Sequence, residues 1–174
     1  MTTRWNDVCQ AAPQLAQWVQ ARFAPHEHHV LATLRADGSP RVSGIEVDFG
    51  GGEVWLGMIW HSRKALDLRR DPRCAVHVNP GAGADELRAG DARLSGVAVE
   101  VHEGEARAAY VARLGPPHPF HLFRIDVHEV TRTWNGEGTL QLQSWRPGPG
   151  LRTFRPHERA APAAAPAPGG GRRR

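Results

Sequence analysis

Four consecutive residues, Ser62 to Ala65, combine side chains that can bind a phosphate group. They read Ser-Arg-Lys-Ala and stand where an apolar strand pattern ends and a helical spacing begins. The first turn of a helix leaves N–H groups unpaired and carries a partial positive charge. A hydroxyl, a guanidinium and an ammonium add charge-assisted donors there. The segment therefore predicts an anion site, although basic residues in a first helical turn are also common as solvated surface residues.

Histidine and cysteine residues suggest other chemistries with weaker support. His26-Glu27-His28-His29 lacks the four-residue histidine spacing of a metalloprotease helix and leads into a strand pattern, so a polar loop is favoured and no metal site is predicted. The segment His118–His121 leaves a histidine ligand for haem open. Cys9 and Cys74 stand far apart, without the spacing of a zinc or dithiol centre.

The apolar residues recur with two periods, which separate helices from strands. Spacings of three to four predict a first helix within Asp7–Phe23, starting near Ala12 because Pro13 suits only a first turn. Strands are expected at 29–34, 41–49, 53–60, 74–78, 92–101, 120–134 and 139–145. The first three are predicted to form a meander. Short helices are expected at 63–70, with Ser62 as the N-cap, and at 105–114. About seven strands favour a mainly β fold, a closed or half-closed antiparallel barrel with helices over its ends.

Most of the net charge lies in the last residues of the chain. The 174 residues carry 22 Lys+Arg and 18 Asp+Glu, a net charge of +4, which would suit a nucleic-acid partner. Arg159 and Arg172–Arg174 against Glu158 supply most of this excess, so residues 1–156 carry only +1. We therefore expect no specific nucleic-acid binding. The Ala/Pro/Gly composition of 157–174 predicts a disordered tail after a single domain at 1–156.

The composition suits a soluble domain of ordinary size, with 40% hydrophobic and 23% charged residues. No stretch approaches the roughly 20 apolar residues that cross a bilayer, and residues 1–25 lack the layout of a signal peptide. We expect no membrane partner and a cytoplasmic location.

Two segments of the sequence resemble a known family. Leu31-Ala-Thr-Leu-Arg-Ala-Asp-Gly-Ser-Pro-Arg-Val42 and Ser62-Arg-Lys-Ala-Leu-Asp-Leu-Arg-Arg-Asp-Pro-Arg-Cys-Ala-Val76 are similar to the pyridoxamine 5'-phosphate oxidase-like split-barrel flavoproteins. The similarity covers about residues 28–103, and a weaker similarity is found at 123–155. It implies a split β-barrel, antiparallel and Greek-key-like with a few short capping helices, which holds FMN at the interface of a homodimer.

The resemblance also assigns residues to the phosphate of the cofactor. Arg41, followed by Val42, matches the strand arginine that reaches the phosphate tail of the flavin. Arg63 and Lys64, after Ser62, match the phosphate-binding pair, which is the role that the local chemistry suggests independently. Lys64 is the only lysine of the chain.

Four further residues are assigned to the flavin by the same resemblance. Gly57 and Met58 would offer backbone groups to the isoalloxazine. Trp145 and Arg155, ten residues apart, repeat the spacing of a Trp and an Arg that contact FMN from the partner subunit. Trp145 could equally be a core aromatic at the end of the barrel.

The sequence departs from the oxidase proper at its substrate residues. Glu46 replaces a lysine that receives the substrate phosphate, and Tyr110 and Arg113 stand three residues apart where the family has four. Asp91 falls near the place of a flavin-contacting glutamine, and Leu151–Thr153 replaces an Arg-Leu-His element for pyridoxal phosphate. These differences argue against the oxidation of vitamin B6 specifically.

The resemblance predicts an FMN-binding oxidoreductase that transfers a hydride through flavin N5 to or from an unknown small substrate. No residue is recognisable as a catalytic acid or base. Two alternatives stay open: a reductase that uses the deazaflavin coenzyme F-420, and a non-enzymatic module that binds flavin or haem.

Overall fold

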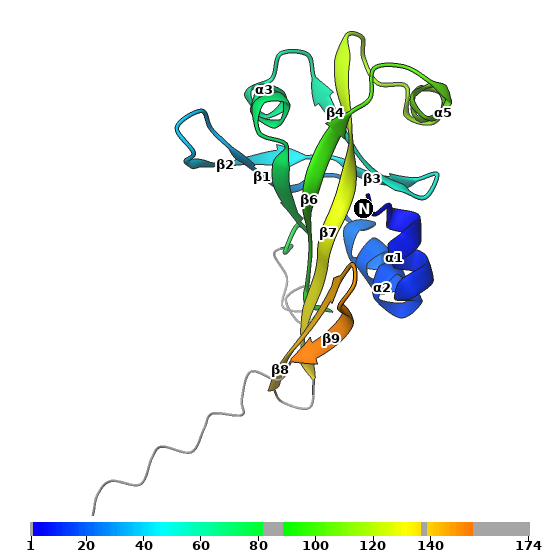
Figure 1. The fold of residues 1–174 in the computed structure, drawn as a ribbon, viewed down its shortest axis with the longest axis vertical. Helices are drawn as coiled ribbons and strands as arrows, with labels where there is room; N and C mark the ends of the chain where they lie inside the picture. The colour runs from blue at the N-terminus through cyan, green and yellow to red at the C-terminus, as the bar shows by residue number, and fades with distance from the viewer. Residues whose placement is uncertain (1, 82–88, 137–138, 155–174) are drawn as a thin grey trace, which may run out of the picture.

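The computed structural model describes residues 2–81, 89–136 and 139–154 (Figure 1). Within these residues, nine strands form one antiparallel sheet. The strands are β1 His29–Leu34, β2 Pro40–Ile45, β3 Val47–Gly50, β4 Glu53–Ile59, β5 Arg73–His77, β6 Asp91–Glu100, β7 Phe120–Gly136, β8 Thr139–Arg146 and β9 Gly150–Phe154. The helices are α1 Trp5–Ala11, α2 Pro13–Phe23, α3 Arg63–Arg70 and α5 Glu105–Leu114. The predicted mainly β, antiparallel architecture with short helices is confirmed, and α3 and α5 have the predicted bounds.

The two edge strands of the sheet come from one continuous stretch of sequence, and this connection closes the sheet into a barrel. The strand order is β2-β1-β5-β6-β7-β4-β3, so β2 and β3 lie at opposite ends. Only Glu46 separates them in the chain. The antiparallel neighbours of the predicted meander are present, since β1 pairs with β2 and β3 pairs with β4. The continuous middle strand expected at 41–49 is wrong, because it breaks at Glu46 into β2 and β3. This arrangement is the split barrel.

The N-terminal segment forms two helices that cover one face of the sheet (Figure 1). The predicted start near Ala12 is confirmed for α2, which has Pro13 in its first turn. The residues before it are a separate helix, α1, because Ala12 leaves the helical region with φ −145° and ψ 63°. Trp5 and Val8 of α1 are fully buried against the sheet.

The core is divided into two clusters by the sheet. The larger one joins α1 and α2 to the inner face and includes Leu56 and Met58 of β4. The smaller one lies under α5 and includes Trp55 and Tyr110. Because side chains alternate along a strand, Gly57 faces α5 while Met58 faces the main core.

The C-terminal part of the sheet is longer than expected. β7 and β8 form the predicted hairpin, and β9 adds a strand that the sequence did not indicate. Pro147, Gly148 and Pro149 precede β9, and such residues normally mark a loop. The predicted boundary at 156 and the predicted disorder of 157–174 lie outside the described residues.

No helix of the described segments is long and apolar enough to span a membrane. The cytoplasmic location stays a prediction from the sequence.

Candidate cofactor-binding site

The start of α3 presents a buried hydroxyl without a partner. Ser62 takes the N-cap position, as predicted, with the extended angles φ −60° and ψ 145°. Its carbonyl accepts the N–H of Leu66 at 3.0 Å. Its Oγ does not cap the helix and is buried without a hydrogen-bond partner. A buried polar atom of this kind is costly unless a ligand or water satisfies it.

A histidine holds the turn that leads into α3. His61 has a positive φ of 59°, which is uncommon for a residue with a side chain. Its N–H donates to Nε2 of His121 at 3.2 Å, and Nδ1 of His121 lies 2.6 Å from Oε1 of Glu100. The ring of Trp60 stacks on His121 with centroids 4.3 Å apart. Both nitrogens of His121 are thus engaged inside the protein, which argues against this histidine as a haem ligand.

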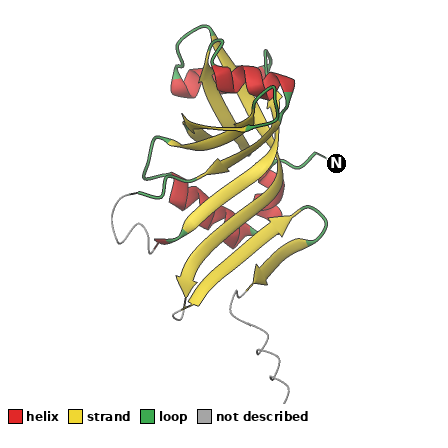
Figure 2. Ribbon diagram, turned by 90° about the vertical axis from the view of Figure 1, so that its left-hand side faces the viewer, coloured by secondary structure: helices red, strands yellow, loops and turns green. Residues whose placement is uncertain are grey.

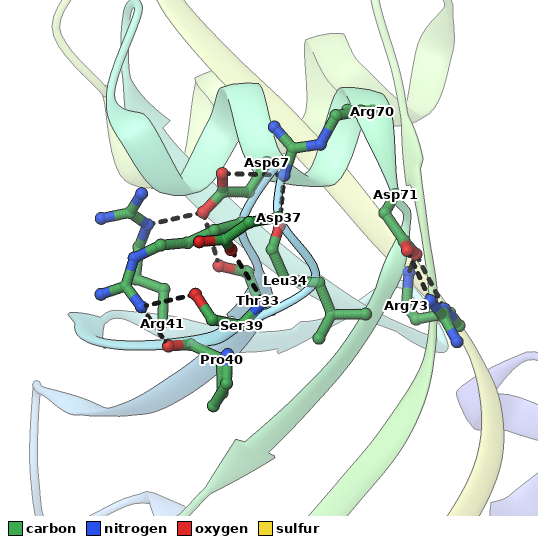
Figure 3. Close-up of polar contacts among 11 residues, drawn as sticks. Thr33, Leu34, Asp37, Ser39, Pro40, Arg41, Asp67, Arg70, Asp71 and Arg73 are labelled. Carbon is green, nitrogen blue, oxygen red and sulfur yellow. Dashed lines mark hydrogen bonds and ion pairs between the residues drawn. The ribbon is translucent and has the colours of Figure 1, made fainter.

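A buried carboxylate ties the predicted arginine of β2 to α3. Asp67, which is 4% exposed, accepts a hydrogen bond at Oδ2 from Nε of Arg41 at 2.6 Å (Figure 3). The same oxygen accepts Oγ1 of Thr33 at 3.0 Å, and Oδ1 accepts Nη2 of Arg70 at 3.1 Å. Burial alone would raise the pKa of Asp67, but the hydrogen bonds from Arg41, Arg70 and Thr33 outweigh it and hold the pKa below its ordinary value. Asp67 therefore remains an anion that fixes Arg41.

An arginine-lined groove of about 430 Å³ opens beside this network. Its lining includes Arg35, Arg41, Arg63 and Arg70. Asp67 and Asp37 supply two negative charges against these four guanidinium groups. Within the described part of the chain, Arg63 makes no hydrogen bond or ion pair, so its guanidinium is available to an anion. The groove is chemically suited to a phosphate.

Lys64 bridges α3 to β2. Its Nζ donates to the carbonyl oxygen of Gly44. Burial lowers the pKa of Lys64, and the nearby charge of Glu46 opposes that shift. The charge of Glu46 therefore favours the ammonium form of Lys64, while the carboxylate itself is 67% exposed and lies 3.9 Å from Nε2 of His28.

The end of β4 offers backbone groups on an unpaired edge. β7 pairs with β4 from Trp55 to Ile59, whereas β3 pairs with it only from Glu53 to Leu56. Gly57 and Met58 therefore lack a strand neighbour on the β3 side. Contact of these backbone groups with a flavin ring stays a prediction.

Tyr110 of α5 fits against Gly57. A Cβ built on Gly57 would lie 2.5 Å from Oη of Tyr110 and 3.5 Å from its Cζ. Burial raises the pKa of Tyr110, and the charges of Asp48 and Glu46 raise it further. The hydroxyl therefore stays protonated over a wide pH range.

We expect Gly57→Ala to lower the free energy of unfolding by about 1–3 kcal/mol, because the new methyl group overlaps Oη of Tyr110. Adding Tyr110→Phe should restore most of that loss, since the remaining contact is of ordinary length. Urea denaturation measures both. Gly44→Ala is the matched control, because nothing lies within 4 Å of its Cβ. Equal losses in the single and double variants would contradict the packing described.

The remaining predicted residues are placed as follows. Val42 follows Arg41 on β2 and is 69% exposed. Trp145 is 4% exposed and belongs to the main core of its own chain. Arg155 lies outside the described residues. The structure thus gathers Arg41, Ser62, Arg63 and Lys64 around α3, whereas contact of Trp145 and Arg155 with a partner's cofactor stays a prediction.

Comparison with protein families gives one match. The model described as pyridoxamine 5'-phosphate oxidase matches residues 15–134. The chain belongs to this family. The matched region of this oxidase-family member contains the α3 site, the arginine of β2 and the strands that hold them. The comparison with curated proteins gives no match.

Solved structures share the fold. A pyridoxamine 5'-phosphate oxidase-related, FMN-binding protein from Nostoc punctiforme matches with a TM-score of 0.59 and 13% identity over 83% of this chain and 95% of that one. PhzG from Burkholderia lata, in complex with tetrahydrophenazine-1-carboxylic acid, matches with a TM-score of 0.58 and 18% identity over 85% and 90%.

A haem-binding protein from Mycobacterium smegmatis matches with a TM-score of 0.55 and 24% identity over 72% of this chain. The match covers 56% of the length of that protein. At these identities the likeness shows the fold alone, so different ligands occur among proteins of one architecture.

Proposed function

We propose that the chain binds FMN with its phosphate at the start of α3 and acts as a flavin-dependent oxidoreductase. The observation that carries the proposal is the buried Oγ of Ser62, which has no hydrogen-bond partner among the described residues. Arg63, next in the chain, makes no hydrogen bond or ion pair with them either. A phosphate oxygen at this point would accept the hydroxyl and the N–H groups of the first turn. The residues present therefore fit the group.

Each residue of the site has a distinct task in this proposal. Arg63 donates directly to the phosphate, and Arg41 offers the guanidinium nitrogens that Asp67 does not use. Lys64 contributes positive charge while it keeps β2 next to α3. The open edge of β4 at Gly57 and Met58 orients the ring. When bound, a flavin supplies hydride transfer at N5, and the chain supplies position and charge.

The substrate class is less constrained than the cofactor. The charge of Glu46, whose side chain is 67% exposed, acts on Lys64 and Tyr110 and would disfavour a substrate phosphate beside them. We therefore propose a small substrate without a phosphate group at that position. Tyr110, buried over Gly57, offers a hydroxyl beside the β4 backbone that is proposed to orient the ring.

A homodimer is part of the proposal. Val42 and Ile59 are 69% and 77% exposed, and Trp60 is 44% exposed. These apolar side chains flank the α3 site, where a second copy would cover them together with the cofactor.

Two other cofactors remain as alternatives. The deazaflavin coenzyme F-420 carries a phosphate that the same arginines would bind. Haem is supported by the fold shared with a haem-binding protein. Of the two histidines in the segment His118–His121, His121 is engaged inside the protein, whereas His118 is exposed.

The absorption spectrum of the purified chain, followed by titration with FMN, coenzyme F-420 and haem, tests the proposal. FMN binding should give bands near about 370 and 450 nm, which belong to the cofactor itself, and sedimentation should give the mass of a dimer. Reduction of the bound flavin by a donor would distinguish an enzyme from a carrier. Binding of haem alone, or of none of the three, would overturn the proposal.

A further inference from the structure

A buried histidine of β7 lies against the turn that leads from β4 into α3. The side chain of His121 is fully buried, and the residue pairs with Met58 of β4 in the sheet. In the turn, the N–H of Ser62 donates to the carbonyl oxygen of Ile59 at 3.1 Å, and Ser62 is the N-cap of α3. Figure 1 shows α3 at the upper end of the sheet, and in Figure 2 this end lies above α1 and α2. His121 therefore lies next to the start of α3.

The hydrogen bonds of His121 determine where its proton lies. Nδ1 lies 2.6 Å from Oε1 of Glu100, and a carboxylate can only accept, so Nδ1 carries the proton. Nε2 accepts the backbone N–H of His61 at 3.2 Å, so Nε2 carries none. Both contacts are satisfied only by a neutral imidazole with its proton on Nδ1. A second proton would have to be taken up at Nε2.

Charged and titratable groups from several elements surround this ring. Glu100 ends β6, and its Oε2 lies 3.2 Å from Nε of Arg69 on α3 and 3.5 Å from Nε2 of His102. The ring of His61 meets that of His121 edge-on, with centroids 6.2 Å apart. Within the described residues, these are the charged or titratable groups that contact His121 or Glu100. The side chain of Glu100 is 13% exposed and lines a cavity of about 200 Å³, so the network reaches solvent.

The turn depends on the hydrogen bond to His121 because its backbone has an unusual conformation. His61 has a φ of 59°, which a residue with a side chain rarely adopts unless its surroundings hold it there. The side chain of His61 is exposed and contacts the ring of Trp60, with centroids 4.8 Å apart. The main chain of His61 is thus held to the buried interior by the bond from its N–H to Nε2 of His121.

We infer that His121 is a positioning residue of the cofactor site, which holds the turn at His61 only while its imidazole is neutral. The inference rests on the proposed function, in which the first turn of α3 binds the phosphate of FMN. A second proton on His121 places an N–H at Nε2, directly opposite the N–H of His61. Two donors cannot form a hydrogen bond with each other, so the turn relaxes. Ser62 and the N–H groups behind it then leave the phosphate.

The positive charge of a protonated His121 acts in the opposite direction, since it would attract a phosphate. Glu100 lies 2.6 Å from Nδ1, so its carboxylate pairs with the imidazolium and offsets that charge. The lost hydrogen bond, by contrast, acts directly on the residue before Ser62. Acidification therefore weakens the binding of FMN.

Fluorescence titration of the full chain with FMN at about pH 8 and about pH 5, the range in which histidine changes its charge, tests the inference. The amide oxygen of His121→Gln can accept the N–H of His61 and does not titrate, so at the higher pH this variant should bind FMN within about threefold of the native chain. At the lower pH the native chain should lose at least about tenfold more affinity than the variant, the value of one lost hydrogen bond. The phosphate of FMN also titrates, but equally for both chains. Equal losses of affinity would overturn the inference.

Three further variants assign the effect to the ring of His121. His121→Phe keeps an aromatic ring against Trp60 but has no acceptor, so it should bind FMN about tenfold more weakly already at the higher pH. His61→Gly keeps the backbone N–H and suits a positive φ, so it should retain the native pH dependence. His102→Gln, at an exposed histidine beside Glu100, is the matched control and should retain it too. Loss of the pH dependence in His61→Gly or His102→Gln would contradict the assignment.

Nitrogen-15 NMR of the unliganded chain separates this inference from the proposed function. As the pH falls from about 8 to about 5, Nε2 of His121 should become protonated, and the amide signal of His61 should shift with the same midpoint. If both changes occur and FMN does not bind at any pH, the proposed cofactor is wrong while the coupling of His121 to the turn stands. If FMN binds but Nε2 stays unprotonated, or the amide of His61 does not follow it, the proposed function stands and the inference is wrong.

Discussion

Replacing both Arg63 and Lys64 with alanine is expected to weaken FMN binding by about 10²- to 10⁴-fold. Each charge-assisted contact to a phosphate is worth about 1.5–3 kcal/mol, and about 1.4 kcal/mol corresponds to a tenfold change in affinity. Arg63 should account for the larger share, because it has no partner within the described residues, whereas Lys64 is already bonded to the Gly44 carbonyl. Fluorescence titration with FMN measures the loss.

Riboflavin separates a phosphate contact from a general effect on the fold. It has the same ring and no phosphate, so its affinity should be the same for the double variant and the native chain. Arg73→Ala, a variant of an exposed arginine outside the α3 site, should leave both affinities unchanged. An equal loss for riboflavin and FMN would show that the two residues support the fold and do not bind the phosphate.

Asp67→Asn is expected to lower the free energy of unfolding by about 2–4 kcal/mol at neutral pH. Removing one partner of a buried ion pair leaves the other charges uncompensated. The side chain of Asp67 is 5% exposed and accepts hydrogen bonds from Arg41, Arg70 and Thr33. The side chains of Arg41 and Arg70 are 25% and 41% exposed, so without this carboxylate they can turn partly to water. Urea denaturation measures the change. The affinity for FMN should fall as well, because Arg41 would lose the carboxylate that orients it.

The effect of Asp67→Asn should also depend on pH. The pKa of Asp67 in the folded protein lies below the ordinary value of 3.8. The carboxylate therefore contributes its full stability above pH 3.8, and that contribution is lost as the pH falls through the lowered pKa. The difference in stability between the native chain and the variant should thus shrink below this pH. A difference that stays constant down to acid unfolding would contradict the ionised network.

The parts of the site that sequence alone predicted depend on local chemistry. Ser62, Arg63 and Lys64 are recognisable because hydroxyl and basic groups at the start of a helix need only a few neighbouring residues to define an anion site. The bounds of α3 and α5 were predicted for the same reason, since helical spacing and turn residues are local signals. The family resemblance then assigned Arg41 from another strand.

The parts that were missed depend on contacts between distant segments. Asp67 looks like an ordinary polar position of a short helix, and only the packing of β1 and β2 against α3 gives it Thr33 and Arg41 as partners. The break at Glu46 was not predicted because the apolar alternation runs through it from Ile45 to Phe49. The segment His118–His121 left a histidine ligand for haem open, whereas in the structure Nε2 of His121 accepts the backbone N–H of His61 and so stabilises the turn before α3.

The pairing of β4 with β7 also determines when the site can form during synthesis. β4 carries Gly57 and Met58, and the strand that pairs with these two residues is the segment from Phe120 to Arg124 of β7. The ribosome releases the phosphate-binding residues long before it releases that segment. Contacts of such sequence separation form late and slowly. On the proposed assignment, the nascent chain would complete its cofactor site only after β7 has left the exit tunnel, and cofactor binding would then follow folding of the barrel.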